Sequence, residues 1–486
     1  MNLRLPTCLA ALLCLTLGTE LAHATLDLSA CTLAGSQGYG RVEAQCGRLQ
    51  RPENPDEPSG AQIQLFVARI ASLSPDPQPD AFTIINGGPG ASSVSLYVDL
   101  ASAFTGILRE RDIVIVDQRG TGRSNPLECR DLEEASQEYS EDVVRSATSQ
   151  CLNSLSVDPR FYSTSQAVAD LDAVRHALGY STLNVYGVSY GTRVGLHYLR
   201  RYPDRVRTLI IDGVVPPDLA LGVNVAENAQ VTLDGIFQRC RDDVNCASSF
   251  PDLQRTFDQL REHLRSQPMA LSVAHPVTGV SEFMDLSYDH LAVTLRLLSY
   301  APETAALIPL IITETSNGNY TPVASQALKI IEQLTGAISF GMHNSVVCTE
   351  DLPFVNSAAI DWSALEQTYL GADQVRALQT ICDIWPTATM DPDLKEPLQS
   401  DTPVLVLSGE HDPITPPAYG DRVNATLSNS LHIIGKGQGH GIISRGCIPR
   451  LVNDLVETAQ VEALDASCAE RLSTTPFFLN LMGPAP

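Results

Sequence analysis

Positive charge is scarce in this chain of 486 residues, because Lys and Arg together number 32 against 56 Asp and Glu. The formal net charge is therefore -24 at pH 7. This balance argues against nucleic acid or an anionic membrane surface as the main partner, since both repel a polyanion. It is compatible with attraction of cationic substrates, and equally with an acidity that serves only solubility.

Long hydrophobic runs are also missing. The apolar run from Leu9 to Leu17 is too short to cross a bilayer, which takes ~20 residues. Arg4 before it and Ala22-His23-Ala24 after it complete the pattern of a secretory signal peptide, with cleavage near Ala24. No later segment has a transmembrane pattern. We therefore expect a secreted or periplasmic protein without a stable membrane anchor.

Metal-binding motifs are absent from the sequence. It has no C-x-x-C or H-E-x-x-H, and zinc ligands usually come in such close pairs, so we expect no metal site. Of the 12 cysteines, only Cys8 and Cys14 fall in the leader, and an even number in an exported chain indicates disulfides. The remaining cysteines form neighbouring pairs along the sequence, which predicts Cys31–Cys46, Cys129–Cys151, Cys240–Cys246, Cys348–Cys382 and Cys447–Cys468. Sequence alone leaves other connectivities open.

Internal repeats and low-complexity tracts are absent too, and the pattern that is present alternates strands with helices. Short apolar runs typical of buried parallel strands occupy residues 63–70, 81–85, 112–117, 183–186, 208–213, 404–407 and 431–434. Segments of helical periodicity lie between or after them, as at 165–178 and 448–459. This alternation predicts an α/β fold with a doubly wound, mostly parallel sheet.

The pattern changes between residues 214 and 394. Apolar residues recur there at helical spacing, as in 291–312 and 324–334, and buried-strand runs are nearly absent. We interpret residues 214–394 as a helical cap inserted between two parts of one core, residues 25–213 and 395–486. A chain with 44% hydrophobic residues can bury both a core and such a cap.

The most informative motif is the G-x-S-x-G of Gly187-Val188-Ser189-Tyr190-Gly191. A strand pattern precedes it and a helix-compatible run, residues 192–201, follows it. A nucleophile elbow needs this strand, sharp turn and helix so that the serine oxygen stands clear of the sheet. The two glycines remove side chains where strand and helix crowd the turn. Ser189 is therefore the predicted nucleophile.

A serine hydroxyl needs a base, and the base needs an orienting acid. In the α/β-hydrolase order the acid and then the histidine follow the serine. Two loops after predicted strands supply Asp412 and His440, at strand ends where such folds place ligand-facing groups. Glu410 is a rival acid, and His411 and His432 are rival bases; His411 adjoins the proposed acid and His432 lies within a strand pattern.

The reaction also needs donors for the developing oxyanion. In this fold one is the backbone N–H after the nucleophile, here that of Tyr190, and another comes from a loop after an early strand. Gly87-Gly88-Pro89-Gly90 occupies that loop. Pro89 has no N–H, so Gly88 is the predicted second donor, with Gly87 as the alternative.

Five segments together resemble the prolyl aminopeptidase and tripeptidyl aminopeptidase family of α/β-hydrolases. They are Asn86-Gly87-Gly88-Pro89-Gly90, the DQRGTGRS of residues 117–124, the GVSYG of 187–191, the GEHDP of 409–413 and the GHG of 439–441. They occur in the family's order and span most of the chain. Classical prolyl aminopeptidases usually have His where this chain has Asn86, which favours the larger, exported tripeptidyl-aminopeptidase-like branch.

The resemblance implies a serine exopeptidase that acts on peptides with a free N-terminus and needs no cofactor. It also implies an acidic anchor in the cap, because a peptide α-amine (pKa ~7.7–8.0) is largely cationic at neutral pH. Val346–Pro353 resembles the family segment near the end of the cap, so Glu350 is the predicted amine ligand, with Asp351 second.

Two other functions fit the same motifs. A secreted carboxylesterase would share the whole triad, since fold and triad do not set the substrate. A catalytically silent binding protein could keep the fold, although an intact Ser189, Asp412 and His440 speak against it. The sequence does not give the number of residues released per cut, the preferred residue before the cut or the oligomeric state.

Overall fold

The computed structural model describes residues 26–36, 40–129, 132, 140–334 and 336–484. The predicted leader, residues 1–24, lies outside this part of the chain. Within the described part, none of the helices has the length and hydropathy that a membrane crossing requires.

A nine-stranded sheet forms the centre of the molecule, in the order β1-β2-β3-β5-β4-β6-β7-β10-β11. Its strands are β1 (Ser29–Ala34), β2 (Arg41–Pro52), β3 (Gln62–Ile70), β4 (Ala81–Ile85), β5 (Ile113–Val116), β6 (Leu183–Val188), β7 (Val206–Asp212), β10 (Val404–Gly409) and β11 (Ser430–Gly435). The pairs β1–β2, β2–β3 and β3–β5 are antiparallel, and the remaining pairs of this sheet are parallel. The predicted α/β fold with a mostly parallel sheet is therefore confirmed.

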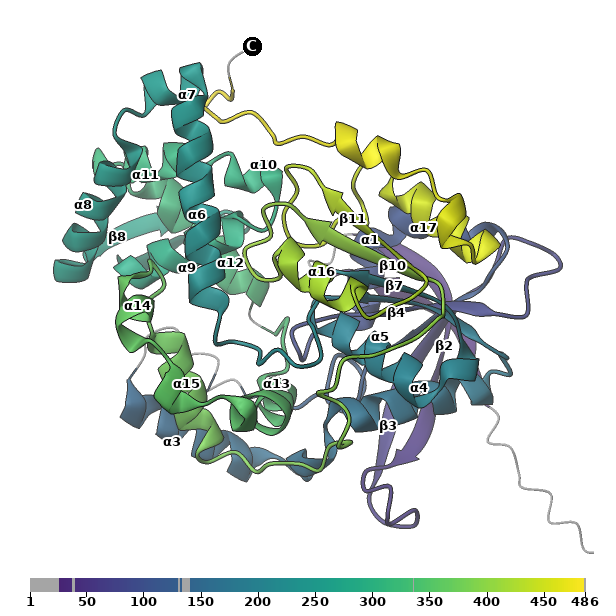
Figure 1. Cartoon of the computed structure of the whole chain (residues 1–486). Helices are drawn as coiled ribbons and strands as arrows, with labels where there is room; N and C mark the ends of the chain where they lie inside the picture. The colour runs from purple at the N-terminus through teal and green to yellow at the C-terminus, as the bar shows by residue number, and fades with distance from the viewer. Residues whose placement is uncertain (1–25, 37–39, 130–131, 133–139, 335, 485–486) are drawn as a thin grey trace, which may run out of the picture.

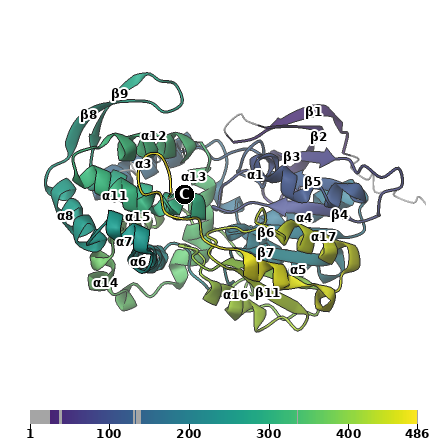
Figure 2. The ribbon, with the colours of Figure 1, turned by 90° about the horizontal axis from the view of Figure 1, so that it is seen from above.

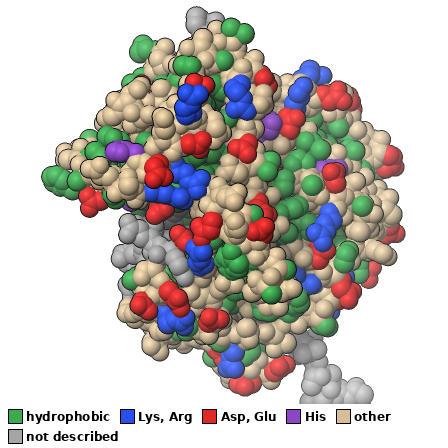
Figure 3. Space-filling view, turned by 60° about the vertical axis from the view of Figure 1, so that its left-hand side comes forward, with side chains coloured by type: hydrophobic (Ala, Val, Ile, Leu, Met, Phe, Trp, Pro, Cys, Tyr) green, Lys and Arg blue, Asp and Glu red, His purple; other side chains and the backbone are tan. Residues whose placement is uncertain are grey.

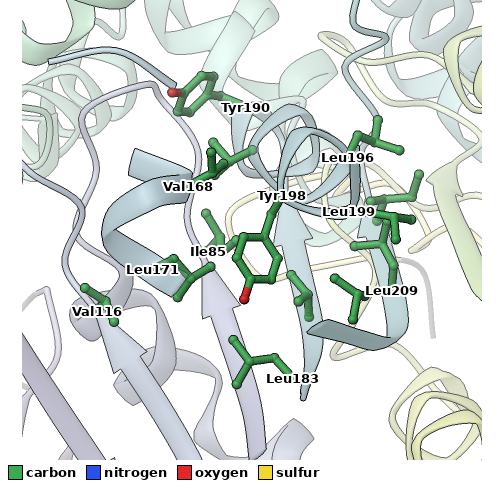
Figure 4. Close-up of a cluster of buried hydrophobic side chains, with 14 of the residues drawn as sticks. Ile85, Val116, Val168, Leu171, Leu183, Tyr190, Leu196, Tyr198, Leu199 and Leu209 are labelled. Carbon is green, nitrogen blue, oxygen red and sulfur yellow. The ribbon is translucent and has the colours of Figure 1, made fainter. Parts of the chain in front are cut away.

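Helices cover both faces of this sheet (Figure 1). Helices α4 (Thr164–Ala177) and α5 (Tyr190–Arg201) pack on one face, and α1 (Ser93–Leu100) and α17 (Ile448–Thr458) on the other. Figure 4 shows Val168 and Leu171 of α4 beside Ile85 and Tyr198 in the first of these two cores. Strand β4 lies between the two cores and is buried along its whole length, which explains its unbroken apolar sequence.

Most of the segment that we interpret as the cap lies in a second lobe beside the sheet (Figure 2). Its helices are α6 (Val225–Asp242), α7 (Val244–Ser249), α8 (Leu253–Ser266), α9 (Tyr288–Leu298), α10 (Pro302–Ala305), α11 (Ile308–Ser316), α12 (Thr321–Leu334), α13 (Phe340–Val346), α14 (Trp362–Gln367) and α15 (Asp373–Cys382). It also contains a hairpin that the sequence pattern did not predict, β8 (Met269–Ala274) with β9 (Ser281–Leu286). Most residues of these strands are at least partly exposed, so they lack the continuous apolar run of a buried strand.

Two further α-helices are α3 (Glu141–Ser154), which precedes α4, and α16 (Pro417–Asn424), which joins β10 to β11. The C-terminal segment, residues 472–484, crosses from the core to the cap (Figure 1). Phe477 is buried in the cap core, and the Phe478 N–H donates to the Ala306 carbonyl. On the way, Ser473 accepts a hydrogen bond from Gln438 in the loop after β11. The tail thus ties the cap to that loop.

Five disulfides are present among the described residues, and each joins cysteines that the sequence paired. They are Cys31–Cys46, Cys129–Cys151, Cys240–Cys246, Cys348–Cys382 and Cys447–Cys468. The closed loops are short, with sequence separations from 6 to 34 residues. Each bridge therefore constrains one local segment of the unfolded chain.

Candidate active site

Ser189 lies at the turn between β6 and α5, with φ 57° and ψ -128°. Few non-glycine residues adopt this strained conformation, which is typical of a nucleophile elbow. The Ser189 N–H donates to the Asp212 carbonyl at 2.9 Å. A Cβ on Gly87 would lie 2.6 Å from the Ser189 Cβ, so only glycine allows the loop after β4 to approach the serine so closely.

His440 and Asp412 meet at the ends of β11 and β10. The Nδ1 of His440 lies 2.8 Å from Asp412 Oδ2. Asp412 is 2% exposed, and its carboxylate accepts hydrogen bonds from the N–H groups of Ile414 and Thr415 and from the Thr415 hydroxyl. A carboxylate oriented this way holds the imidazole with Nδ1 as the donor, which leaves Nε2 to act as the base.

Tyr300 of the cap also contacts His440. The His440 backbone N–H donates to the Tyr300 carbonyl at 2.8 Å, and the Tyr300 ring meets the imidazole edge-on at 5.2 Å between centroids. Burial opposes the charged imidazolium, but the charge and hydrogen bond of Asp412 outweigh it, so the pKa of His440 is raised. Asp212 adds to this rise and Arg296 opposes it. A protonated imidazole at this position is thereby stabilised.

Ser189 and His440 converge on the turn after β7. A Cβ on Gly213 would lie 3.0 Å from His440 Cε1, and Asp212, the preceding residue, bonds the Ser189 N–H. Among the described residues, Ser189 Oγ makes no hydrogen bond to the imidazole. Such bonds are often long without substrate and tighten in the complex. The structure thus brings the three predicted triad residues to one edge of the sheet.

The rival residues occupy other positions. Glu410 accepts from the Gly437 N–H at 2.7 Å, and its side chain and that of His411 are both about two-fifths exposed. Glu410 therefore orders the backbone of the loop that carries His440, whereas Asp412 contacts the imidazole itself.

His432 belongs to a second Ser–His–Asp chain. Its Nε2 lies 2.9 Å from Ser408 Oγ, and its Nδ1 lies 2.9 Å from Asp421 Oδ1. Ser408 is 0% exposed, and a Cβ on Gly420 would lie 2.7 Å from its hydroxyl. Helix α16 therefore covers this serine, and no carbonyl of a substrate can reach it. The second chain stabilises the packing of α16 on the sheet.

The oxyanion donors predicted from the sequence lie in the loop after β4, which approaches Ser189 at Gly87, and at the first residue of α5. The Gly87 N–H donates to Asn86 Oδ1 at 2.7 Å and is already used, whereas Gly88 follows it in the same loop. Tyr190 is the first residue of α5, so its N–H is one of the helix donors without an intrahelical acceptor. Helix N-termini favour negative charge. The loop favours Gly88 over Gly87 as the second donor.

The structure does not bring the predicted amine anchor to an open surface. Glu350 is 0% exposed, and its two oxygens accept from the Thr164 N–H and the Thr164 hydroxyl, each at 2.7 Å. The same hydroxyl lies 2.7 Å from the Tyr190 hydroxyl. Burial raises the pKa of Glu350 to about 7, although Arg193 and Thr164 oppose the rise. In this conformation Glu350 supports the residue after the nucleophile.

Asp351 is equally enclosed. It forms two hydrogen bonds with Arg193, at 2.8 and 3.1 Å, and accepts from the Leu221 N–H. Lys395 approaches the same carboxylate at 3.4 Å. Asp351 thus joins the end of the cap to α5, and its burial leaves no open surface for a substrate amine in this conformation. The sequence could not predict this, since Arg193 lies far away in the chain.

Asp212 is a site residue that the sequence analysis missed. Its carboxylate accepts hydrogen bonds from the N–H groups of Ile442 and Ile443 and from the Tyr186 hydroxyl. Its carbonyl accepts from Ser189, so one residue positions both the nucleophile and the loop that carries His440. The signal was an acid directly after the apolar run of residues 209–211 in β7. Burial raises the pKa of Asp212 to about 6, although these donors oppose the rise.

Replacing Asp212 with Asn should remove a pH dependence of stability. The folded pKa, about 6, lies above the ordinary 3.8, so the stabilising contribution is present below pH 3.8 and is lost as pH rises through 6. Two pH units correspond to about 3 kcal/mol. Urea unfolding at several pH values should show wild type losing about this much relative to the variant between pH 3.5 and 7. Parallel curves for the two proteins would contradict the shift.

The described residues contain no cluster of three or more His, Cys, Asp or Glu side chains that could hold a metal ion. The arrangement of Ser189, His440 and Asp412 resembles that of a nucleophile, a general base and an orienting acid. Such an arrangement can carry out acyl transfer through a serine ester.

A family model described as the alpha/beta hydrolase fold matches residues 80–444. The chain is 25% identical to a tripeptidyl aminopeptidase of Streptomyces lividans, covering 89% of this chain and 85% of the relative. It is 28% identical to carboxylesterase B of Mycobacterium tuberculosis, over 77% of this chain and 76% of the relative. A serine protease of the same organism is 31% identical over 36% of each. The relatives thus include both peptidases and an esterase.

Proposed function

The chain belongs to the alpha/beta hydrolase fold family, and from this premise we propose that it is a serine exopeptidase. It removes residues or short peptides from the free N-terminus of peptides. The observation that carries the hydrolase part is the His440–Asp412 bond beside the strained elbow at Ser189. The similarity to a tripeptidyl aminopeptidase over most of both chains supports the peptidase part.

The proposed mechanism follows the serine-hydrolase template. His440 takes the proton from the Ser189 hydroxyl, and the serine oxygen attacks the scissile carbonyl. The Gly88 and Tyr190 N–H groups bind the resulting oxyanion. His440 then gives its proton to the leaving amine, and water, activated by the same histidine, hydrolyses the acyl-enzyme. Asp412 orients the imidazole throughout.

Two observations support the proposed recognition of a free substrate amine. One relative is a tripeptidyl aminopeptidase, and Glu350 supplies a carboxylate that could bind an ammonium group. Because Glu350 is 0% exposed, a substrate ammonium can approach this carboxylate only if the groups packed on it, including Thr164, move aside. A cation beside the carboxylate would favour its ionised form, whereas burial favours the neutral one. Glu350 and Asp351 are thus the proposed amine ligands of a substrate-bound conformation.

Export is part of the proposal. Disulfides persist in oxidising compartments and are rare in the cytosol, and five of them are present here. On the face shown in Figure 3, acidic side chains are interspersed with basic ones. That face has no extended positive surface of the kind that binds nucleic acid. The proposed partner is a peptide substrate.

A panel of fluorogenic substrates tests this function. It contains Ala-Ala-Pro, Pro, Ala and Phe amides, each with a free or acetylated N-terminus, and a simple acetate ester. Cleavage of the free-amine amides alone is the expected result, and the length of the preferred peptide gives the number of residues released. Equal cleavage of acetylated substrates, or cleavage of the ester alone, would favour the second candidate, a carboxylesterase like one of the relatives.

A further inference from the structure

One continuous segment of the cap, residues 338–351, contacts both elements that carry the proposed oxyanion donors. It runs through α13 and ends in the π-helical turn η5 (Val347–Asp351). Such turns are rare and occur frequently at functional sites. Met342 and Val346 of this segment are buried in the same hydrophobic core as Tyr190. The segment therefore packs on the core of the sheet although it belongs to the cap.

The start of this segment holds the loop that carries Gly88. The Ser339 N–H donates to the Gly90 carbonyl at 3.0 Å. Next to this bond, Ile338 and Ala91 form an isolated antiparallel bridge. A Cβ on Gly90 would lie 2.7 Å from the Ser339 carbonyl oxygen, so only glycine allows the two chains to approach this closely. The tip of the loop therefore rests on the cap.

The other side of the same loop faces the nucleophile. A Cβ on Gly87 would lie 2.6 Å from the Ser189 Cβ, and the Ala91 N–H donates to the Gly87 carbonyl at 3.2 Å. Gly88 thus lies in a short closed turn, with the serine at one end and the cap at the other. A displacement of the cap at Ser339 would be transmitted through this turn to the Gly88 N–H.

The end of the segment holds the element that carries the second donor. Glu350, in η5, accepts from the Thr164 hydroxyl at 2.7 Å, and the same hydroxyl lies 2.7 Å from that of Tyr190. Asp351 forms two hydrogen bonds with Arg193 of α5. All five side chains are buried. Because α5 begins at Tyr190, these contacts fix its first turn and with it the Tyr190 N–H.

We propose that residues 338–351 of the cap hold the two oxyanion donors in register with each other, with Ser339 and Thr164 as positioning residues. An oxyanion hole works only when both donors lie within hydrogen-bond distance of one oxygen, so their separation has to be fixed. The inference rests on the proposed serine-hydrolase mechanism and assigns the cap a part in it. The cap then acts on the chemical step and not only on substrate selection.

Ser339→Pro tests the contact at the loop. Ser339 has φ -75°, which proline adopts, and Ile338 is extended in its bridge, as the residue before a proline should be. Proline has no N–H to donate to Gly90. Hydrolysis of a neutral acetate ester should lose roughly 10- to 100-fold in kcat, somewhat less than the loss of an oxyanion donor itself. KM should change less than about three-fold, because no group that binds the ester is removed.

Ser339→Ala is the matched control, because it keeps the backbone N–H and should retain wild-type kinetics. A trifluoromethyl ketone supplies a second measurement. A serine adds to trifluoroacetophenone and leaves an oxyanion, whereas acetophenone binds without that charge. In Ser339→Pro the inhibition constant of trifluoroacetophenone should rise about as much as kcat/KM falls, since this adduct resembles the transition state. The inhibition constant of acetophenone should stay near that of the wild type.

A pair of variants at Thr164 tests the other end of the segment. Thr164→Val removes the hydroxyl between Glu350 and Tyr190 at nearly the same volume. It should lower kcat on the ester roughly 3- to 10-fold, the range of one hydrogen bond, with little change in KM. Thr164→Ser keeps the hydroxyl and should restore kcat.

Two results would overturn the inference. One is a folded Ser339→Pro whose kcat and trifluoroacetophenone affinity stay within about three-fold of the wild type. The other is a loss that appears in KM alone, or equally in Ser339→Ala. If Ser339→Pro does not fold, equal kinetics of Thr164→Val and Thr164→Ser overturn the inference, and a loss of kcat confined to Thr164→Val supports it. The ester and the ketones carry no amine and no peptide bond, so failure of the exopeptidase proposal leaves these tests unaffected.

Discussion

Replacing Ser189 with Ala should lower kcat on every substrate by a factor on the order of 10^6, the size of effect found when a serine hydrolase loses its nucleophile. The elbow places one hydroxyl between the loop after β4 and the turn after β7. No other group can form the acyl-enzyme there. KM should change much less than kcat, because the variant removes only an oxygen. Steady-state kinetics with the preferred substrate of the fluorogenic panel measure both parameters.

Ser408→Ala is the matched control, since Ser408 also bonds a histidine that bonds an aspartate. The hydroxyl is covered by α16, so kcat should stay within a few-fold of wild type. Its loss leaves His432 Nε2 without its partner, and stability should fall by about 1–3 kcal/mol. A loss of activity in Ser408→Ala comparable with that in Ser189→Ala would contradict the assignment of the nucleophile.

Asp412→Asn should lower kcat about 10^4-fold while leaving the fold intact. An amide in place of the carboxylate can donate to Nδ1, which favours the wrong tautomer and removes the negative charge that stabilises the imidazolium. The pKa of His440 should also fall, because Asp412 outweighs burial in raising it. The acidic limb of the pH profile of kcat/KM should therefore move to lower pH in the variant.

The variant Glu410→Gln tests whether Glu410 or Asp412 is the acid that orients His440. Glu410 bonds the Gly437 N–H, and a glutamine oxygen can accept the same bond. We expect a change in kcat of less than about ten-fold, since no charge beside His440 is lost. If Glu410→Gln were the more damaging of the two substitutions, Glu410 would be the acid of the triad and the assignment of Asp412 would be wrong.

The fold could be predicted because its buried strands are continuous apolar runs. Strands β4, β6 and β7 appear in the sequence almost as the structure has them, and the strand-to-helix pattern around Ser189 gives the elbow. The exposed strands could not be found the same way. Residues on β1 and on the cap hairpin alternate between exposed and half-buried positions, which leaves no strong hydrophobic period.

The residues of the proposed triad could be chosen from the sequence because they lie in turns and loops directly after strands, in a known order. What surrounds the triad was not, because those contacts join distant parts of the chain. Asp212 reaches Ile442, and Glu350 reaches Thr164, across 230 and 186 residues. Burial changed the interpretation of Glu350, since an acidic pair in a sequence looks the same whether it faces solvent or Arg193.

The most direct test of the central claim is to label the protein with a fluorophosphonate and locate the adduct by peptide mapping. A fluorophosphonate reacts with a serine only when a base activates it and oxyanion donors hold the phosphoryl oxygen. The structure predicts one adduct, on Ser189, and none in the Asp412→Asn variant over the same time. An adduct on Ser408 or on another serine, or no adduct on the folded wild type, would contradict the account.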